Sequence, residues 1–273
     1  MQGETQPEAR SDVANDLGQV FFRPVHWQSA FEETVERLSQ AIKLGAVVVG
    51  EQLPSERELV SKLEVSRTTL REAIRALQQE GILRTQRGRS GGTFVASDGA
   101  RVLSRQEAKG IIDHMGEGLN HLIDIRAAVE PRAAELAARR VTPEGVERLR
   151  RLLESFRGVS VNELRRGDSL VHITIAQLSA SDLLMDTVLR VQSRLHDLLA
   201  FLSVVPTPKA AARHESRQHG TIVEAIAERD SSGAREAMAK HIAATEDLLK
   251  GLMKRGSTPS SGSRSEQRAA ASS

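Results

Sequence analysis

Two short amphipathic helices joined by a tight turn are the feature that most restricts what this chain can fold into. The segment Ser55–Glu58 follows Pro54 and has the Ser-x-x-Glu pattern of a capping box, which opens a short helix. Val65 and Ser66 interrupt that helix, and Ser66 can cap a second one. The apolar stripe of the second helix consists of Leu70, Ala73, Ile74 and Leu77. This spacing predicts a helix-turn-helix.

The residues on either side of this pair complete a winged helix. One helix face precedes it, formed by Phe31, Val35, Leu38 and Ile42 at helical spacing. After it, the β-prone runs ILRTQ and TFVA flank a glycine-rich segment at residues 87–92, which predicts a hairpin. We therefore expect a winged helix-turn-helix DNA-binding domain over residues 26–97.

The rest of the chain is predicted to be helical. Residues 111–253 have helical periodicity and contain no alternating strand run. The polar residues 98–110 are the predicted linker, and residues 1–25 and 254–273 have the composition of disordered tails. The predicted fold class is mainly α, with an N-terminal winged helix-turn-helix that includes a small β-hairpin and a C-terminal all-α helical bundle.

Composition excludes several classes of site. The chain has no cysteine, which rules out disulfides, cysteine-ligated zinc, iron–sulfur clusters and thiol nucleophiles. A metal site would therefore need histidine and carboxylate ligands. Seven aromatic residues are too few for a stacking platform that grips single-stranded nucleic acid, whereas duplex binding stays open. No apolar window reaches membrane length and no signal peptide is recognisable, so we expect a cytoplasmic protein without a membrane partner.

Positive charge is concentrated in the predicted DNA-reading segment. The whole chain carries a net charge of only +2, but residues 67–89 contain six arginines and two glutamates, a local charge of +4. If Leu70 faces the core, Arg71 and Arg75 face outward. Arginine can grip guanine with two hydrogen bonds or hold a phosphate, and an Arg-Gly-Arg tip is thin enough for a minor groove. For any single arginine, a merely solvated role is the alternative.

The segment Leu38–Val95 resembles the DNA-binding domain of the GntR family of bacterial transcription regulators. The resemblance rests on the phrases LPSEREL, VSRTTLREA and EGIL, followed by a glycine-rich wing that ends in TFV. It implies double-stranded operator DNA as a partner and implies contacts from Arg57, Ser66, Arg67, Thr68, Thr69, Arg71, Arg87, Gly88 and Arg89. It implies no such contact for Arg75.

Four residues of the helical half could bind a metal. Asp168 and His172 are four residues apart and share one helix face. His219 and His241 lie on either side of a predicted turn at Asp230–Gly233, at comparable heights of about 12–17 Å from it. One aspartate and three histidines from neighbouring helices could surround a divalent metal and leave positions open for water or a ligand. An ordinary polar contact between the first two residues is the alternative.

The helical half also resembles the FCD domain, the all-helical effector domain of the FadR-like GntR branch. The phrases DSLVH, ESRQHGTIVEAIAERD and AREAMAKHI carry this resemblance, together with LIDIRAAVEPRAAELAA, over about residues 111–250. It implies that Asp168, His172, His219 and His241 are metal ligands. It also implies that Arg126 faces an effector pocket, where a guanidinium would suit a carboxylate. The alternative for Arg126 is an ion pair with Asp124 or Glu130.

Taken together, these features predict a homodimeric transcription regulator and no enzyme. We expect a repressor whose operator affinity is controlled by a small carboxylate bound at a divalent metal: zinc, with nickel or manganese as alternatives. One rival function is a sensor of the metal ion itself. A second is a metal-dependent hydrolase, for which no carboxylate is placed as a general base by spacing. A third is an acyl-CoA binder, although relatives of that kind tend to lack the histidine set.

Overall fold

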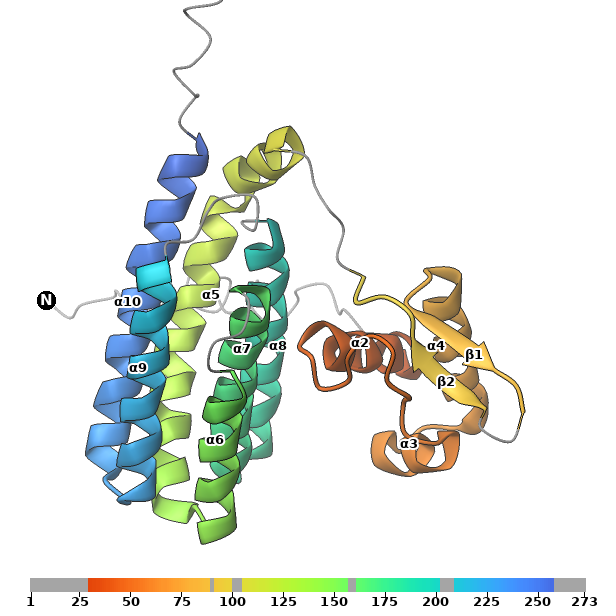
Figure 1. The fold of residues 1–273 in the computed structure, drawn as a ribbon, viewed down its shortest axis with the longest axis horizontal. Coiled ribbons are helices and arrows are strands. Elements are labelled where there is room, and N and C mark those ends of the chain that lie inside the picture. Colours follow the sequence, from red (N-terminus) through yellow and green to blue (C-terminus); the bar gives the residue numbers. More distant parts are fainter. Residues whose placement is uncertain (1–28, 89–90, 100–104, 157–160, 202–208, 258–273) are drawn as a thin grey trace, which may run out of the picture.

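The structure, a computed structural model, describes residues 29–88, 91–99, 105–156, 161–201 and 209–257. A small winged helix lies beside a larger bundle of long helices (Figure 1). The elements of the winged helix are α2 (Ala30–Lys43), α3 (Glu56–Leu63), α4 (Arg67–Gln79), β1 (Leu83–Gln86) and β2 (Gly92–Val95). Those of the bundle are α5 (Arg105–Arg140), α6 (Pro143–Ser155), α7 (Val161–Leu178), α8 (Asp182–Phe201), α9 (Lys209–Ala227) and α10 (Ser231–Ser257).

Side-chain caps determine where the helices of the winged helix begin. The Ser55 hydroxyl accepts a hydrogen bond from the Glu58 amide at 3.3 Å, and the Glu58 carboxylate accepts one from the Ser55 amide at 2.9 Å. Ser66 caps α4 by accepting from the Thr69 amide at 3.0 Å. Between the two helices, Glu64 has a left-handed φ of 53°, which turns the chain sharply. The helix-turn-helix predicted from these residues is confirmed.

The winged helix has its own apolar core. Leu70 and Leu77 of α4 are fully buried and pack with Leu38 and Ile42 of α2. The antiparallel hairpin pairs Leu83 with Val95 and Gln86 with Gly92. Leu83 and Val95 of the hairpin belong to this core, so the hairpin is held against α4.

In the bundle, the long helix α5 contacts α7, α8, α9 and α10. It begins at Arg105, so residues 105–110, which the sequence predicts as linker, are helical. The run RQEAKG there is polar, but all of its residues except the glycine are good helix formers. The predicted tails lie outside the described residues, apart from residues 254–257, which end α10.

Breaks between the bundle helices follow the local sequence. Thr142 caps α6 by accepting a hydrogen bond from the Gly145 amide at 3.2 Å, and Pro143 occupies the first turn. Asp230 caps α10 through the Gly233 amide at 2.9 Å. The core of the bundle is continuous across α5, α6, α7, α9 and α10. The predicted fold class, mainly α with a two-stranded hairpin in the winged helix, is confirmed.

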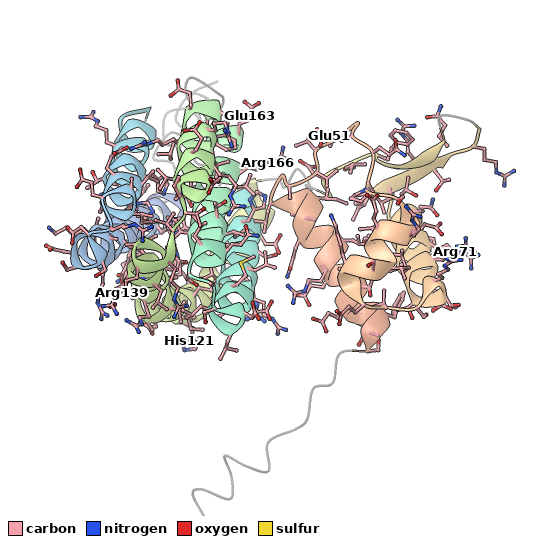
Figure 2. The ribbon with its side chains drawn as sticks, turned by 90° about the horizontal axis from the view of Figure 1, so that it is seen from below. Glu51, Arg71, His121, Arg139, Glu163 and Arg166 are labelled. Atoms are coloured by element: carbon pink, nitrogen blue, oxygen red, sulfur yellow. The ribbon has the colours of Figure 1, made fainter. Side chains whose placement is uncertain are left out.

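The two parts touch where α2 meets α8 (Figure 1). Arg37 of α2 forms an ion pair with Asp186 of α8 at 3.0 Å, and Lys43 forms one with Asp197 at 3.0 Å. Arg166 of α7 lies on the side of the bundle that faces the winged helix (Figure 2). Among the described helices, none combines the length and the apolar character needed to cross a membrane.

Candidate functional site

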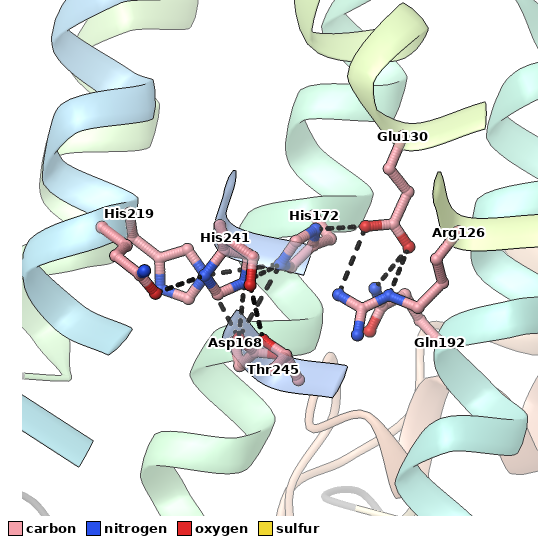
Figure 3. A network of polar contacts seen from close by, with 9 residues as sticks. Arg126, Glu130, Asp168, His172, Gln192, His219, His241 and Thr245 are labelled. Carbon is pink, nitrogen blue, oxygen red and sulfur yellow. Dashed lines mark hydrogen bonds and ion pairs between the residues drawn. The ribbon is translucent and has the colours of Figure 1, made fainter. Parts of the chain in front are cut away.

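The structure brings together the four residues singled out as metal ligands (Figure 3). Asp168 and His172 come from α7, His219 from α9 and His241 from α10. The Nε2 atom of His172 lies 3.1 Å from that of His241 and 3.3 Å from that of His219. The Asp168 Oδ1 atom lies 3.1 Å from His219 Nε2, 3.8 Å from His172 Nε2 and 3.7 Å from His241 Nε2. One donor atom from each residue therefore faces a common centre.

This convergence follows from helix geometry. One helical turn separates Asp168 from His172, so both project from the same face of α7. The chain reverses between α9 and α10, where Arg229 has a left-handed φ of 59°. That reversal sets the two helices side by side, and His219 and His241 meet at the same height.

The centre is almost closed to solvent. The His172 and His241 side chains are fully buried, His219 is 6% exposed and Asp168 is 17% exposed. Burial, together with the neighbouring His219 and His172, lowers the pKa of His241 to about 2. Burial alone would raise the pKa of the Asp168 carboxyl, but His172, followed by His219 and His241, brings it below its ordinary value. A neutral imidazole and an ionised carboxylate are the forms that coordinate a metal.

The donor set fits a divalent transition metal. At metal–ligand bond lengths of about 2.0–2.1 Å, a tetrahedral ion separates its ligand atoms by about 3.3–3.4 Å. The Nε2–Nε2 distances of 3.1 and 3.3 Å and the 3.1 Å from Asp168 Oδ1 to His219 Nε2 are close to that spacing, and the other two distances from Asp168 Oδ1 are 3.7 and 3.8 Å. Neutral imidazoles that turn their lone pairs toward one another repel unless a cation or a proton lies between them. These four residues could therefore hold a metal ion.

A second layer of buried polar residues lies behind His172 (Figure 3). Glu130 of α5 approaches His172 Nδ1 with its Oε2 atom at 2.7 Å. The Oε1 atom of Glu130 accepts hydrogen bonds from Arg126 Nε at 3.0 Å and from Gln192 Nε2 at 2.9 Å. Burial alone would raise the pKa of the Glu130 carboxyl, but Arg126 and His172 lower it to about 2. On the other side of the centre, His241 Nδ1 lies 3.1 Å from Gln218 Oε1.

Arg126 is 1% exposed and forms the ion pair with Glu130 that the sequence offered as an alternative to an effector contact. Glu130 lies between Arg126 and the candidate ligand His172 and contacts both. Sequence reasoning named Glu130 only as a possible partner of Arg126, and it did not single out Gln192 or Gln218. The four-residue spacing of Arg126 and Glu130 was the available signal, whereas the two glutamines reach the site from distant segments.

Most of the predicted DNA-contacting residues are exposed. Those with exposed side chains or backbone are Arg57, Ser66, Arg67, Thr68, Arg71, Arg87 and Gly88, while Thr69 is half-buried. Arg89 lies outside the described residues. Arg71 is on the side of the winged helix turned away from the bundle (Figure 2). A duplex could therefore approach this side without meeting the helical part.

An open hollow of about 710 Å³ lies between α3, α4 and the hairpin. Arg71, Arg75 and Arg87 line it. Within it, Arg71 Nε donates a hydrogen bond to Glu56 Oε2 at 2.9 Å. Arg75, for which the sequence resemblance implies no DNA contact, is exposed in the same hollow.

Comparison with known proteins assigns both parts of the chain. Residues 31–95 match the family described as bacterial regulatory proteins, gntR family, and residues 121–244 match the FCD domain. The chain is 31% identical over 212 residues to the protein named as HTH-type transcriptional regulator RmpR of Mycobacterium gastri, and this alignment covers 76% of each chain.

Two further regulators align over even more of the chain. The HTH-type transcriptional repressor NanR of Cronobacter sakazakii is 29% identical over 248 residues, which cover 88% of this chain and 92% of NanR. The Exu regulon transcriptional regulator of Escherichia coli is 28% identical over 228 residues, which cover 80% of this chain and 84% of that protein. This chain belongs to the GntR family of bacterial regulatory proteins, in the FadR-like branch that joins the winged helix to an FCD domain.

Proposed function

We propose that this protein is a homodimeric transcription repressor controlled by a small carboxylate metabolite, which binds at a divalent metal ion in the FCD domain. The observation that carries the proposal is the convergence of four donor atoms, one from half-buried Asp168 and three from the buried residues His172, His219 and His241, in a chain that also has a GntR-type winged helix. The similar protein NanR is named as a repressor, which supports repression in this proposal.

On the DNA side, two winged helices would read a two-fold symmetric operator. Arg67 and Arg71 lie in the first turns of α4, where a recognition helix meets base edges, and both are exposed. Exposed Arg87 and Gly88 at the hairpin tip suit the adjacent minor groove or its phosphates. The base contacts would supply sequence preference, and the phosphate contacts would supply salt-dependent affinity.

On the effector side, the three histidines and Asp168 would hold the metal, with zinc as the proposed ion and nickel and manganese as alternatives. The metal, when bound, supplies a positive centre that can take a carboxylate oxygen as a further ligand. Arg126 lies behind this centre with its charge paired to Glu130, so an effector carboxylate would meet the metal first and would reach Arg126 only if that ion pair opened.

Control of DNA binding would arise from a shift between two arrangements of the winged helices. The effector would bind more tightly to the arrangement that fits the operator poorly, and operator affinity would fall by that difference. The contact between α2 and α8 supports such coupling because α8 belongs to the FCD domain and α2 to the winged helix.

An operator-binding experiment tests this function. Duplexes would first be selected from a random-sequence pool with the full chain, and binding would then be measured with and without zinc and a panel of small carboxylates. We expect a palindromic operator, a bound metal detected by mass spectrometry, and release by at least one carboxylate only when the metal is present. Release that is identical after metal removal would contradict a metal-bound effector.

Two variants make this experiment specific. His219→Ala and His241→Ala should each reduce the bound metal and the carboxylate response but leave operator binding in place. Full metal occupancy in both would refute the four-ligand site. Release by zinc or nickel alone, without an organic ligand, would instead indicate a sensor of the metal ion.

A further inference from the structure

Each of two candidate ligands has a polar partner behind its ring. In His172 and His241 the Nε2 atom faces the common centre and the Nδ1 atom faces away from it. Behind His241 stands the neutral amide of Gln218, 3.1 Å from Nδ1. Behind His172 stands the carboxylate of Glu130, 2.7 Å from Nδ1. The two partners differ chemically because an amide can donate or accept a hydrogen bond, whereas an ionised carboxylate can only accept.

We propose that Glu130 is the positioning residue of the metal centre: it holds the ring proton of His172 on Nδ1 and so keeps the Nε2 lone pair directed at the metal. This inference deepens the proposed function, since it rests on a metal at these four residues. It assigns to Glu130 a role that is distinct from that of a ligand.

Glu130 has the properties that this role requires. Its side chain is 2% exposed, so water does not compete for the Nδ1 proton. The Arg126 guanidinium donates to both oxygens of the carboxyl, which favours its ionised form, and an ionised carboxylate can only accept. The contact with Nδ1 is short, but it is not aligned as a straight hydrogen bond. Its effect on the tautomer is thus chiefly electrostatic.

Two neighbours hold the Glu130 carboxylate in place. Arg126 donates to both of its oxygens, from Nε to Oε1 at 3.0 Å and from Nη2 to Oε2 at 3.3 Å. Gln192 of α8 donates to Oε1 at 2.9 Å. All three side chains are buried, which prevents the carboxylate from turning away toward solvent. His172 is therefore oriented from α5 and α8, two helices that contribute none of the four candidate ligands.

The tautomer itself is the first test, because it can be read without any metal. The full chain, labelled with ¹⁵N-histidine and stripped of metal with a chelator, would be studied by long-range ¹H–¹⁵N NMR, and the His172 signals would be assigned by their loss in His172→Gln. We expect the ring proton on Nδ1. A ring protonated on Nε2 would overturn the proposal, and this result does not depend on whether the proposed metal binds.

Metal affinity of the Glu130→Gln variant is the second test. The amide keeps the size of the side chain but can also donate, so both His172 tautomers should be populated. We expect zinc affinity, measured by competition with a chromophoric chelator, to fall about 10- to 100-fold. Unchanged affinity together with an unchanged tautomer would refute the role of Glu130.

Two further variants separate this role from a general loss of stability. Glu135→Gln removes a carboxylate of the same helix that pairs with Arg132, Arg139 and Arg235 but contacts none of the four candidate ligands in the described residues, and it should leave zinc affinity and the His172 tautomer unchanged. If Glu130→Gln alone does not fold because Arg126 is left unpaired, the double variant Arg126→Met/Glu130→Gln removes both charges and carries the same expectation. Wild-type affinity in a folded double variant would overturn the proposal.

Discussion

Replacing Arg126 by methionine should destabilise the bundle severely. The change keeps a long unbranched side chain but removes the only guanidinium that donates to both oxygens of Glu130 in the described part of the chain. Both side chains are at most 2% exposed, so the remaining carboxylate would be buried without its cation. Breaking a buried ion pair from one side costs about 3–5 kcal/mol, a large share of the roughly 5–15 kcal/mol that holds a typical domain folded.

The loss of stability in Arg126→Met should depend on pH, and the sign of this dependence follows from the pKa of Glu130. In the wild type, the pKa of Glu130 is lowered to about 2, so its ion pair stabilises the fold above the ordinary pKa near 4.5 and is lost as the pH falls toward 2. In Arg126→Met the largest remaining influence is burial, which raises the pKa of the same carboxyl and favours its protonated form. The deficit of the variant should therefore be largest at neutral pH and should shrink as the pH is lowered to about 4.

Urea denaturation of the metal-free protein, followed by circular dichroism at pH 7 and pH 4, measures both effects. The matched control is Arg132→Met on the same helix, whose side chain is 46% exposed and whose loss should change stability little. The double variant Arg126→Met/Glu130→Gln should recover most of the loss because no lone charge remains. If Arg126→Met lowers the free energy of unfolding by less than about 1 kcal/mol at pH 7, then the premise that each charge of this buried ion pair needs the other is wrong.

Three predictions concern the winged helix. Leu70→Ala should lower the free energy of unfolding by about 2–5 kcal/mol, measured by urea denaturation, because Leu70 is fully buried. Arg71→Ala should abolish the preference for operator over random duplex in a fluorescence anisotropy assay while the circular dichroism of the bundle stays the same, and a retained preference would remove Arg71 from base reading. Arg87→Ala should weaken binding to all duplexes and lower the slope of log affinity against log salt by about one, since its proposed contact is a phosphate.

Local signals explain why the helix starts could be predicted from the sequence. The Ser55 and Ser66 caps each act over three residues, so the residues themselves specify the geometry. The approach of His219 and His241 was also predictable. The chain reverses after Ala227, and the distance of each histidine from that turn follows from the rise per residue of a helix. The start of α5 at Arg105 was missed because polarity was taken as a sign of a linker, although a helix surface is equally polar.

The partners behind the candidate metal centre could not be predicted in the same way. Arg126 could pair with Asp124 or with Glu130, and only the packing of α5 against α7 and α8 decides that it turns inward to Glu130. Gln192 joins this network from 62 residues away in the chain. A single sequence has no periodicity that connects such positions, since their proximity is a property of the assembled bundle.

The same network offers a route by which the candidate metal centre would communicate with the winged helix under the proposed function. Gln192 links the Glu130 carboxylate to α8, and α8 bears Asp197, which pairs with Lys43 of α2 at 3.0 Å. Both partners of that pair are partly exposed, so it contributes at most about 1 kcal/mol, or about fivefold in an equilibrium constant.

If this contact transmits the effector signal, Lys43→Asp should change the effect of metal and carboxylate on operator affinity by up to about fivefold while metal affinity stays the same. The charge swap Lys43→Asp/Asp197→Lys should restore the wild-type response, because it re-forms the pair with its signs exchanged. Operator titrations with and without effector measure this coupling. If the response of Lys43→Asp is unchanged, the pair of Lys43 and Asp197 does not carry the coupling, and the signal leaves the bundle by another route.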